Sequence, residues 1–584
     1  MFGKIVYISD NEAHVQVGNS EVSTNLMNMH VIFEDDKKKI LGEVEDIGQE
    51  IIKIRFQGEI VDGHFVGGVI RKPTLNSVIR IITQEELALI VGSQKDGNML
   101  LGYSPLYDNC PIYIDVNDLF SNHLAVFGNS GSGKSCGVAR ILQNVFSDPN
   151  ILPYRSNFFI FDAYGEYHNA FKVIENINPN FHFKYYTTNE TDTDGERLRL
   201  PIWLLDTDDM ALLLDAGEHS QLTIIERMLK LVKIFSQPDE VSRDYKNHLI
   251  AKAIMTILYT NQTASAKRND AFSILASCST EEFNLEAPVQ GIGYTRKFRE
   301  CFTIDSNGNF SESVLLTEYI SKFINDELDK YEATADNYYT LEDLEKALDF
   351  TLISEGLLRN DKAYNNAITL KVRLHSITIG ETNKFLRYPE YITRDNYIAS
   401  LVSYGGNSKA QIINFNLEDI DDSFAKVLCK VYTKMLFGFA KSLPNRATIP
   451  FHVFLEECHR YVQNDNDKYL LGYNIFERVA KEGRKYGIIL DLISQRPVEI
   501  SDTVISQISN FIIFKMTHPR DIDYIKKMLP NISAEVVEKQ KSLQPGTCVA
   551  FGKAFKVPML IRMQMPNPEP SSSNCDVMDT WRVR

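Results

Sequence analysis

The sequence predicts an α/β protein that has a nucleotide-binding core, a small β-barrel before the core and a helical insertion within it. Three observations lead to this fold class. A phosphate-binding loop stands between a strand pattern and a helix pattern, near-continuous apolar runs recur on both sides of a long helical stretch, and short alternating runs occupy the N-terminal part. A chain of 584 residues also exceeds what one hydrophobic core holds, so several domains are expected.

Residues 1–95 are expected to form the barrel. Short alternating runs separated by turn residues are typical of a small antiparallel barrel. The runs are Lys4–Ile8, Ala13–Val17, Val31–Phe33, Ile40–Val44, Ile51–Phe56 and Phe65–Ile70, with turns at Asn19, Asp35-Asp36, Gly48 and Asp62-Gly63. Because no cluster of catalytic residue types stands here, we interpret the barrel as a module for assembly or partner docking.

Residues 96–202 are expected to form the first part of the core. A connecting segment, Asp96–Phe120, leads to the strand His123–Phe127, to a loop with the pattern Gly, four free positions, Gly-Lys-Ser, and to a helix over Cys136–Phe146. Backbone N–H groups of such a loop surround phosphates at a helix N-terminus. The candidate nucleotide-binding residues are Gly128, Asn129, Ser130, Gly131, Ser132, Gly133, Lys134, Ser135 and Cys136.

A second strand of the core is expected over Asn157–Asp162, because its near-continuous apolar run is typical of a strand buried on both faces. Asp162 and Glu166 follow at its carboxyl end, where open α/β sheets bind their ligands. A solvent-exposed strand end explains these two carboxylates equally well, so the residues alone leave both interpretations open.

Residues 203–403 are expected to form a helical domain. Apolar residues recur at three-four spacing in Met210–Leu214, Leu222–Val232, His248–Tyr259, Val314–Tyr331, Leu341–Leu348 and Tyr364–Leu374. The stretch Glu281–Glu312 shows a weaker helical pattern and contains the basic cluster Arg296-Lys297-Phe298-Arg299. Such a run is usually a solvated face, and a contact to DNA phosphates is the less favoured alternative.

Residues 404–565 are expected to complete the core. Gln411–Phe415 and Phe451–Leu455 have strand patterns, and Glu456 and Glu457 directly follow the second of them. Two acids at a strand end suit nucleotide hydrolysis, because one can orient the Mg²⁺ water shell while the other takes the proton of the attacking water. We therefore interpret these residues as a Walker B element.

A helix is expected from about Tyr469 to Tyr486, and it carries Arg478 and Arg484. The following strand, Ile488–Ile493, leads to Gln495, whose amide can bind the attacking water or the γ-phosphate. The other expected elements are helices over Phe424–Phe437 and Ile522–Met528 and strands over Asn510–Lys515, Thr547–Phe555 and Met559–Met563. Residues 566–584 form a tail, and its part Pro566–Asn574 is expected to lack regular structure.

The composition narrows the class of protein. A formal net charge of −15 argues against general coating of nucleic acid but not against DNA binding in one lined channel. The scattered cysteines form no CxxC pair, the N-terminus lacks the features of a secretion signal, and no long apolar run occurs. These features predict a cytoplasmic protein without a membrane span.

The assembled motifs resemble the HerA family of hexameric DNA translocases and helicases, which belongs to the HerA and FtsK branch of phosphate-loop ATPases. The resemblance rests on Gly128–Ser135, Asp162–Tyr167, Glu456-Glu457-Cys458-His459-Arg460 and the run from Glu482-Gly483-Arg484-Lys485-Tyr486-Gly487 to Ser494-Gln495-Arg496-Pro497. It implies a RecA-like ATPase core, ATP and Mg²⁺ as cofactors, a homo-hexameric ring and double-stranded DNA in the central channel.

The resemblance also implies roles for single residues. Lys134 and Ser135 bind phosphate and Mg²⁺, Glu456 takes the metal role, and Glu457 is the catalytic base. Asp162 and Glu166 line the site, Gln495 senses the γ-phosphate, and either Arg484 or Arg478 completes the site of a neighbouring subunit. Cys136 and Cys458 depart from the usual pattern, but both substitutions are small and are not expected to disable hydrolysis.

Two functions remain open at this point. The first is an ATP-driven motor on double-stranded DNA that works with a partner nuclease or effector enzyme. The second is a nucleotide-gated ring scaffold that assembles and activates a sirtuin-like or nuclease effector in defence against phage. A small-molecule kinase is disfavoured, because nothing in the chain resembles a pocket for a second substrate.

Overall fold

A computed structural model of the chain describes residues 2–17, 26–35, 38–333, 337–354, 361–406, 408–528, 540–571 and 577–582. The expected turns at Asn19 and Asp36 and the tail residues 572–576 lie outside the described residues. The chain divides into two compact units, Met1–Glu196 with Ile398–Asp465 and Asn474–Arg584, and Arg197–Tyr397 with Asn466–Tyr473.

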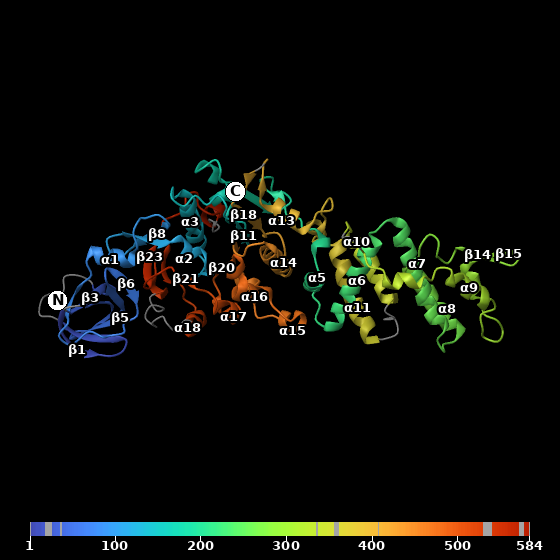
Figure 1. Cartoon of the computed structure of the whole chain (residues 1–584), viewed down its shortest axis with the longest axis horizontal. Coiled ribbons are helices and arrows are strands. Elements are labelled where there is room, and N and C mark those ends of the chain that lie inside the picture. The colour runs from blue at the N-terminus through green and yellow to red at the C-terminus, as the bar shows by residue number, and fades with distance from the viewer. Residues whose placement is uncertain are drawn as a thin grey trace. The chain divides into compact units, whose positions relative to one another are not determined.

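The N-terminal residues form an open, curved antiparallel sheet with the order β1-β2-β5-β4-β3-β7, and β6 pairs with β5 (Figure 1). The expected barrel is therefore only a half-barrel. Among the described residues β1 and β7 lie at the two edges of the sheet and do not pair, so the sheet does not close. The strands are β1 (Phe2–Ile8), β2 (Glu12–Val17), β3 (His30–Asp35), β4 (Lys38–Ile47), β5 (Ile51–Val61), β6 (His64–Gly67) and β7 (Val78–Ile81).

The half-barrel buries both faces of β3. Val31 and Phe33 point into its own core, whereas Ile32 between them joins the core of the nucleotide-binding sheet. This alternation follows from the two-residue period of a strand. Two elements that the sequence did not suggest extend the shared core, namely helix α1 (Gln84–Val91), which Thr83 and Glu86 cap, and the hairpin of β8 (Asn98–Ser104) and β9 (Cys110–Asp115).

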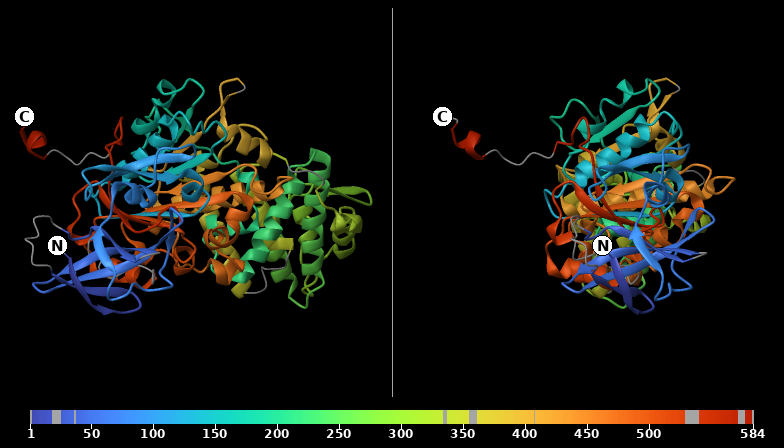
Figure 2. Two further views of the ribbon diagram at one scale, coloured as in Figure 1. Left: turned by 60° about the vertical axis from the view of Figure 1, so that its left-hand side comes forward. Right: turned by 90° about the vertical axis from the view of Figure 1, so that its left-hand side faces the viewer.

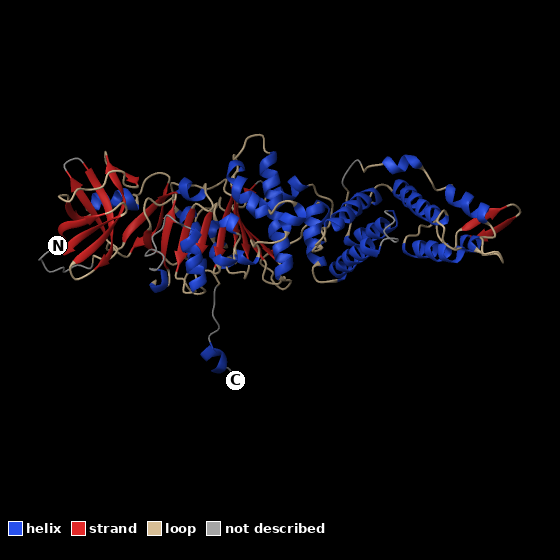
Figure 3. Cartoon of the chain, turned by 90° about the horizontal axis from the view of Figure 1, so that it is seen from below, coloured by secondary structure: helices blue, strands red, loops and turns tan. Residues whose placement is uncertain are grey.

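The nucleotide-binding core is a twelve-stranded mixed sheet with the order β13-β12-β18-β11-β19-β20-β10-β21-β22-β23-β8-β9 (Figure 3). The strands from β12 to β21 pair in parallel, and those from β21 to β9 pair antiparallel. The α/β class is thus confirmed. The further strands are β10 (Leu124–Phe127), β11 (Phe158–Asp162), β12 (Phe183–Thr187), β13 (Glu196–Arg197), β18 (Ile412–Asn416), β19 (Phe451–Leu455), β20 (Ile488–Ser494), β21 (Asn510–Phe514), β22 (Thr547–Gly552) and β23 (Met559–Arg562).

Helices cover this sheet because their apolar stripes pack on strands that are buried on both faces. Helix α3 carries Val138, Ile141, Leu142 and Val145 into the core at the spacing expected of a helix. The helices of the core are α2 (Val116–Phe120), α3 (Lys134–Ser147), α4 (His168–Phe171), α14 (Asp422–Ser442), α16 (Ile475–Glu482), α17 (Asp502–Ile505) and α18 (Pro519–Met528). A further short helix, α20 (Val577–Arg582), belongs to the C-terminal tail.

The second unit is a bundle in which α6, α7 and α10 pack side by side (Figure 2). One expected helix is wrong, because Val314–Tyr331 divides into α9 and a separate 3₁₀ turn over Asp326–Lys330, which Asn325 caps. The elements are α5 (Thr207–Leu213), α6 (His219–Phe235), α7 (Asp239–Leu258), α8 (Ala264–Ser277), the hairpin β14 (Pro288–Gly291) and β15 (Tyr294–Lys297), α9 (Ser313–Ser321), α10 (Leu341–Ser354), α11 (Asp361–Ile379), α12 (Asn383–Leu386) and α15 (Asp467–Leu471).

The expected single helix from Tyr469 to Tyr486 is also wrong. Helix α15 ends at Gly472, whose φ of 80° is left-handed, and Asn474 then caps the start of α16 with its side chain. A 3₁₀ turn follows over Gly483–Tyr486. Arg478 therefore lies on α16 and Arg484 lies on the turn. The boundary between the two units in the sequence falls within α13 (Arg394–Val402), and the short hairpin of β16 (Ser403–Tyr404) and β17 (Ser408–Lys409) follows it.

Candidate nucleotide-binding site

The phosphate-binding loop connects the carboxyl end of β10 with the start of α3. Gly133 precedes the helix with a φ of 104°, a conformation that L side chains rarely adopt. In the described structure no side chain caps α3, so its first N–H groups remain available to an anion. Lys134 is buried, and its Nζ donates to the Asn129 carbonyl oxygen at 3.1 Å. Burial lowers the pKa of Lys134, while the charges of Glu457, Glu456 and Glu166 oppose this shift.

Asp162 organises the loop that follows β11. Its two carboxylate oxygens accept hydrogen bonds from the backbone N–H groups of Glu166 at 3.0 Å and Tyr167 at 2.9 Å, and from the Asn414 side chain at 3.1 Å. With those bonds made and no exposed surface, Asp162 shapes the loop and does not line the cavity.

Glu456 stands next to Asp162 because β11 and β19 are parallel neighbours and end at the same edge of the sheet. Its Oε2 accepts a hydrogen bond from the backbone N–H of Ala163 at 3.1 Å. Burial, followed by the negative charge of Asp162, raises the pKa of Glu456 well above its ordinary value. A carboxyl group held in this way favours a nearby cation, and a bound cation would reverse the shift.

Glu457 has a left-handed backbone with a φ of 46°, which is uncommon for a residue with a side chain. Its carboxylate lines the cavity, accepts a hydrogen bond from the backbone N–H of Gln495 and has one buried oxygen, Oε2, without a hydrogen bond in the described structure. Burial raises its pKa, and the charge of Lys134 partly offsets the increase. The strained backbone thus aims a proton acceptor into the cavity.

The structure brings Lys134, Ser135, Glu166, Glu456 and Glu457 to one cavity of about 580 Å³. Burial raises the pKa of Glu166, while a hydrogen bond with Ser135 lowers it. Tyr164, from the predicted stretch Asp162–Tyr167, also lines it, and the sequence did not point to several other lining residues from distant segments: Glu418, Pro545, Gly546, Met563, Gln564, Met565 and Ser571.

The remaining candidates lie outside the lining of this cavity. Gln495 follows β20 and is half-buried, and its backbone rather than its amide reaches Glu457. The guanidinium of Arg478 lies 3.9 Å from Glu482 and covers the ring of Phe437. Arg484 donates to the Asn122 side-chain oxygen at 2.5 Å. Neither arginine lines the nucleotide cavity of its own chain.

The donors at the cavity fit Mg²⁺ that is bound together with phosphates. No group of three or more His, Cys, Asp or Glu residues suited to a metal occurs in the part of the chain that the structure describes. Mg²⁺ at phosphate sites needs fewer protein ligands than such a group provides, because it keeps several waters and takes only one or two protein ligands besides the phosphate oxygens. The Ser135 hydroxyl and the Glu456 carboxylate would be the candidates for such ligands, and the buried unbonded oxygens of Glu166 and Glu457 could accept from its waters.

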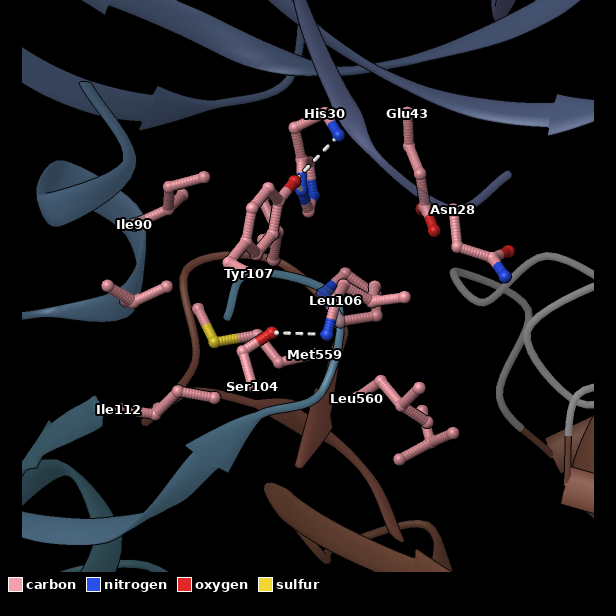
Figure 4. A pocket seen from close by; sticks show the side chains of 14 residues that line it. Asn28, His30, Glu43, Ile90, Ser104, Leu106, Tyr107, Ile112, Met559 and Leu560 are labelled. Carbon is pink, nitrogen blue, oxygen red and sulfur yellow. Dashed lines mark hydrogen bonds between the residues drawn. The ribbon is translucent and has the colours of Figure 1, made fainter. Parts of the chain in front are cut away.

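A second cavity lies where the half-barrel meets the core sheet (Figure 4). The Tyr107 hydroxyl accepts from the His30 backbone N–H at 2.7 Å and lies 2.7 Å from His30 Nδ1. With about 30 Å³ this cavity has room for little more than a water molecule. It is therefore a small void in the packing and not a ligand site.

The basic cluster in the helical unit is neutralised by neighbouring acids. Arg296 pairs with Glu312 at 2.9 Å, Lys297 and Arg299 both pair with Glu286, and Phe298 is buried. These pairs favour the solvated face over a contact to DNA. No described helix is long and apolar enough to cross a membrane.

The chain is similar to known proteins over most of its length. Residues 99–280 match the family model described as helicase HerA, central domain. The chain is 23% identical over 576 residues to a DNA double-strand break repair helicase HerA of Pyrococcus furiosus, covering 96% of this chain and 87% of the relative. It is 23% identical over 559 residues to a probable HerA helicase of Methanocaldococcus jannaschii, covering 94% and 92%.

Two solved structures resemble the chain more distantly. VirB4 of Thermoanaerobacter pseudethanolicus has a TM-score of 0.44 and 11% identity and covers 81% of this chain and 98% of its own. The plasmid coupling protein TrwB in complex with ADP and Mg²⁺ has a TM-score of 0.42 and 12% identity and covers 83% of this chain and 93% of its own.

Proposed function

Because this chain belongs to the HerA family, we propose that it is a ring-shaped motor that translocates on or unwinds double-stranded DNA. It is an ATP-hydrolysing enzyme whose cofactors are ATP and Mg²⁺. The observation that carries the proposal is that Lys134 and Ser135 line the same cavity as the acidic pair Glu456 and Glu457. Energy from hydrolysis at this site would drive movement along DNA.

Each residue contributes a separate step to hydrolysis. Lys134 and the N–H groups at the start of α3 hold the phosphates, and Ser135 and Glu456 would hold Mg²⁺, which neutralises phosphate charge when bound. Glu457 then accepts the proton of the attacking water, for which its raised pKa and its unbonded Oε2 suit it. The Gln495 amide, next to the backbone that fixes Glu457, would report the state of the γ-phosphate.

The ring is proposed because the described lining of the cavity in a single chain offers one cation for the phosphates. Among the described lining residues, Lys134 is the only one with a positive charge. An arginine from a neighbouring subunit is worth on the order of 10³–10⁵ in rate at such sites. Arg484 and Arg478 are the candidates, and we propose a homo-hexamer in which one of them reaches the next site.

The half-barrel supports a proposed role in docking a partner nuclease or other effector. It shares a hydrophobic core with the ATPase sheet through Ile32 and Leu41, so a partner bound there would be coupled mechanically to the core. The alternative is a nucleotide-gated ring scaffold that activates a sirtuin-like or nuclease effector in defence against phage. Both functions use the same ATP site and differ in whether hydrolysis moves DNA.

One experiment separates them. ATP turnover is measured with and without double-stranded DNA, together with displacement of a labelled strand, for the wild type and for Lys134→Ala. The motor predicts turnover that DNA stimulates and displacement that Lys134→Ala abolishes. Slow turnover that is indifferent to DNA, yet necessary for the activity of an added effector, would favour the scaffold. Native mass measurement with and without ATP tests the ring.

A further inference from the structure

The C-terminal segment Met563–Ser571, here called the strap, passes along one side of the nucleotide cavity. It contains no helix or strand, as expected for its Pro-rich part, yet Met563, Gln564, Met565 and Ser571 all line the cavity. These residues lie more than 400 positions along the chain from Lys134, so nothing near the phosphate-binding loop in the sequence points to them.

Several hydrogen bonds fasten the strap to the first helix of the site. The buried Gln143 of α3 accepts from the Asn567 backbone N–H at 2.9 Å and donates to the Pro568 carbonyl oxygen at 2.9 Å. Arg140, one turn earlier on α3, donates to the Gln564 side-chain oxygen at 2.5 Å. A buried side-chain amide that both donates to and accepts from the backbone of another segment fixes that segment in place.

The far end of the strap is fastened to the loop that Asp162 organises. The Ser571 backbone N–H donates to the Glu166 carbonyl oxygen at 2.8 Å, and the Ser571 hydroxyl accepts from the Asn169 side chain. At the near end, the Met563 backbone N–H donates to the Gly546 carbonyl oxygen at 2.9 Å, and Gly546 in turn donates to the Ser132 carbonyl oxygen. The strap is thus built into both walls of the site.

The lining residues divide by chemistry. The charged groups come from the phosphate-binding loop and the strand ends, whereas the strap contributes two thioether side chains, the Gln564 amide, the Ser571 residue and no charge to the lining. The amide of Gln564 is already bonded at both ends, to Arg140 and, at 3.3 Å, to the Tyr103 hydroxyl. Methionine side chains adapt to flat aromatic faces, and small-molecule pockets bury such rings against apolar groups.

We propose that the strap forms the nucleobase subsite of this ATPase, where Met563 and Met565 contact the faces of the purine ring. The proposal rests on the proposed function, because it assumes a nucleoside triphosphate with its phosphates at Lys134 and Ser135. Gln143 does not touch the base in this scheme. It positions the strap, and thereby couples base binding to the helix that starts at the phosphates.

The test compares two ligands that each carry a triphosphate group, only one of which has a nucleobase. Affinities for Mg²⁺·ATP and for Mg²⁺·tripolyphosphate are measured by calorimetry on the full chain for the wild type, Met565→Ala and Gln143→Ala. Met578→Ala is the matched control, since Met578 lies outside the cavity and is 56% exposed, close to the 57% of Met565. Met565→Ala is expected to weaken ATP binding roughly 3- to 10-fold, and Gln143→Ala about 10-fold, with tripolyphosphate affinity unchanged.

The outcomes are distinguishable. Unchanged ATP affinity in Met565→Ala and Gln143→Ala overturns the subsite, as does an equal loss for ATP and tripolyphosphate in a Met565→Ala protein that unfolds at the wild-type temperature. A wild type that binds tripolyphosphate but not ATP also overturns it. If the wild type binds neither ligand, the ATPase function itself fails. Movement on DNA does not enter the readout.

Discussion

The Nδ1 atom of His459 lies 3.2 Å from Oε2 of Glu457, the proposed catalytic base. The same nitrogen lies 3.1 Å from the Ser494 hydroxyl, at the end of the strand that leads to Gln495. Burial lowers the pKa of His459, so its imidazole is neutral at neutral pH. Nδ1 of His459 thus bonds the Ser494 hydroxyl on the strand that would sense the γ-phosphate and lies close to Glu457 Oε2, which itself has no hydrogen bond in the described structure.

This position of Nδ1 predicts a difference between two conservative substitutions of His459. The Asn side-chain nitrogen occupies about the place of Nδ1, whereas the Gln nitrogen occupies about the place of Nε2. His459→Asn should therefore keep most of kcat, while His459→Gln and His459→Ala lower it on the order of 10-fold with KM for ATP unchanged. Steady-state kinetics measure kcat and KM for each variant. An equal decrease of kcat in His459→Asn and His459→Gln would show that His459 contributes only its volume.

Lys134→Ala should abolish ATP turnover, because the variant loses the only cation that lines the described cavity. Radiolabelled phosphate release measures the effect, with Lys172→Ala as a control at an exposed lysine outside the cavity. Wild-type turnover in Lys134→Ala would refute the assignment of the site.

Glu457→Gln should bind ATP with wild-type affinity and fail to cleave it, because the amide keeps the shape of the side chain but accepts no proton. Binding and single-turnover cleavage are measured separately. In the wild type, kcat should fall as the pH decreases through the pKa of Glu457, which burial raises above the ordinary 4.5. Loss of ATP binding in Glu457→Gln would instead make this residue structural.

Glu456→Gln should stabilise the nucleotide-free protein at pH 8 while it lowers turnover. A carboxyl group whose pKa is raised in the folded state favours folding below its unfolded pKa, and this contribution is lost as the pH rises through the folded value. The neutral amide of Gln does not ionise and so avoids this loss of stability. We therefore expect the free energy of unfolding to increase by about 1 kcal/mol at pH 8, and the increase to shrink toward pH 5. Thermal unfolding at both pH values, with the half-exposed Glu499→Gln as control, provides the measurement.

Arg484→Ala or Arg478→Ala should bind ATP normally and hydrolyse it poorly if that arginine completes a neighbouring site. A mixture with Lys134→Ala should then regain some turnover, because a mixed ring can place an intact loop beside an intact arginine. Arg496→Ala is the control, since Arg496 is 57% exposed and pairs with Glu499. Once subunit exchange is confirmed, no recovery with either arginine variant would exclude both as partners in trans. Their role would then be structural, through contacts within their own chain that include Asn122 and Glu482.

Local sequence was sufficient for the parts of the site that consecutive residues build. The phosphate-binding loop, the strand before it and the helix after it stand within about 25 residues, and their periodicity and glycines predict them directly. The same holds for Glu456 and Glu457, because parallel strands that end at one edge of a sheet bring their terminal residues together. The break at Gly472 was missed because glycine is tolerated within helical patterns.

Only the tertiary structure decided which distant segments complete the site. The strap, the contact of His459 with Ser494 and the hairpin of β8 and β9 that extends the sheet depend on pairings between residues far apart in the chain. The open edge of the half-barrel was likewise decided by which strands pair, and alternating patterns are the same in open and closed sheets. Periodicity reports which face of an element is buried, and it carries no information on the partner that buries it.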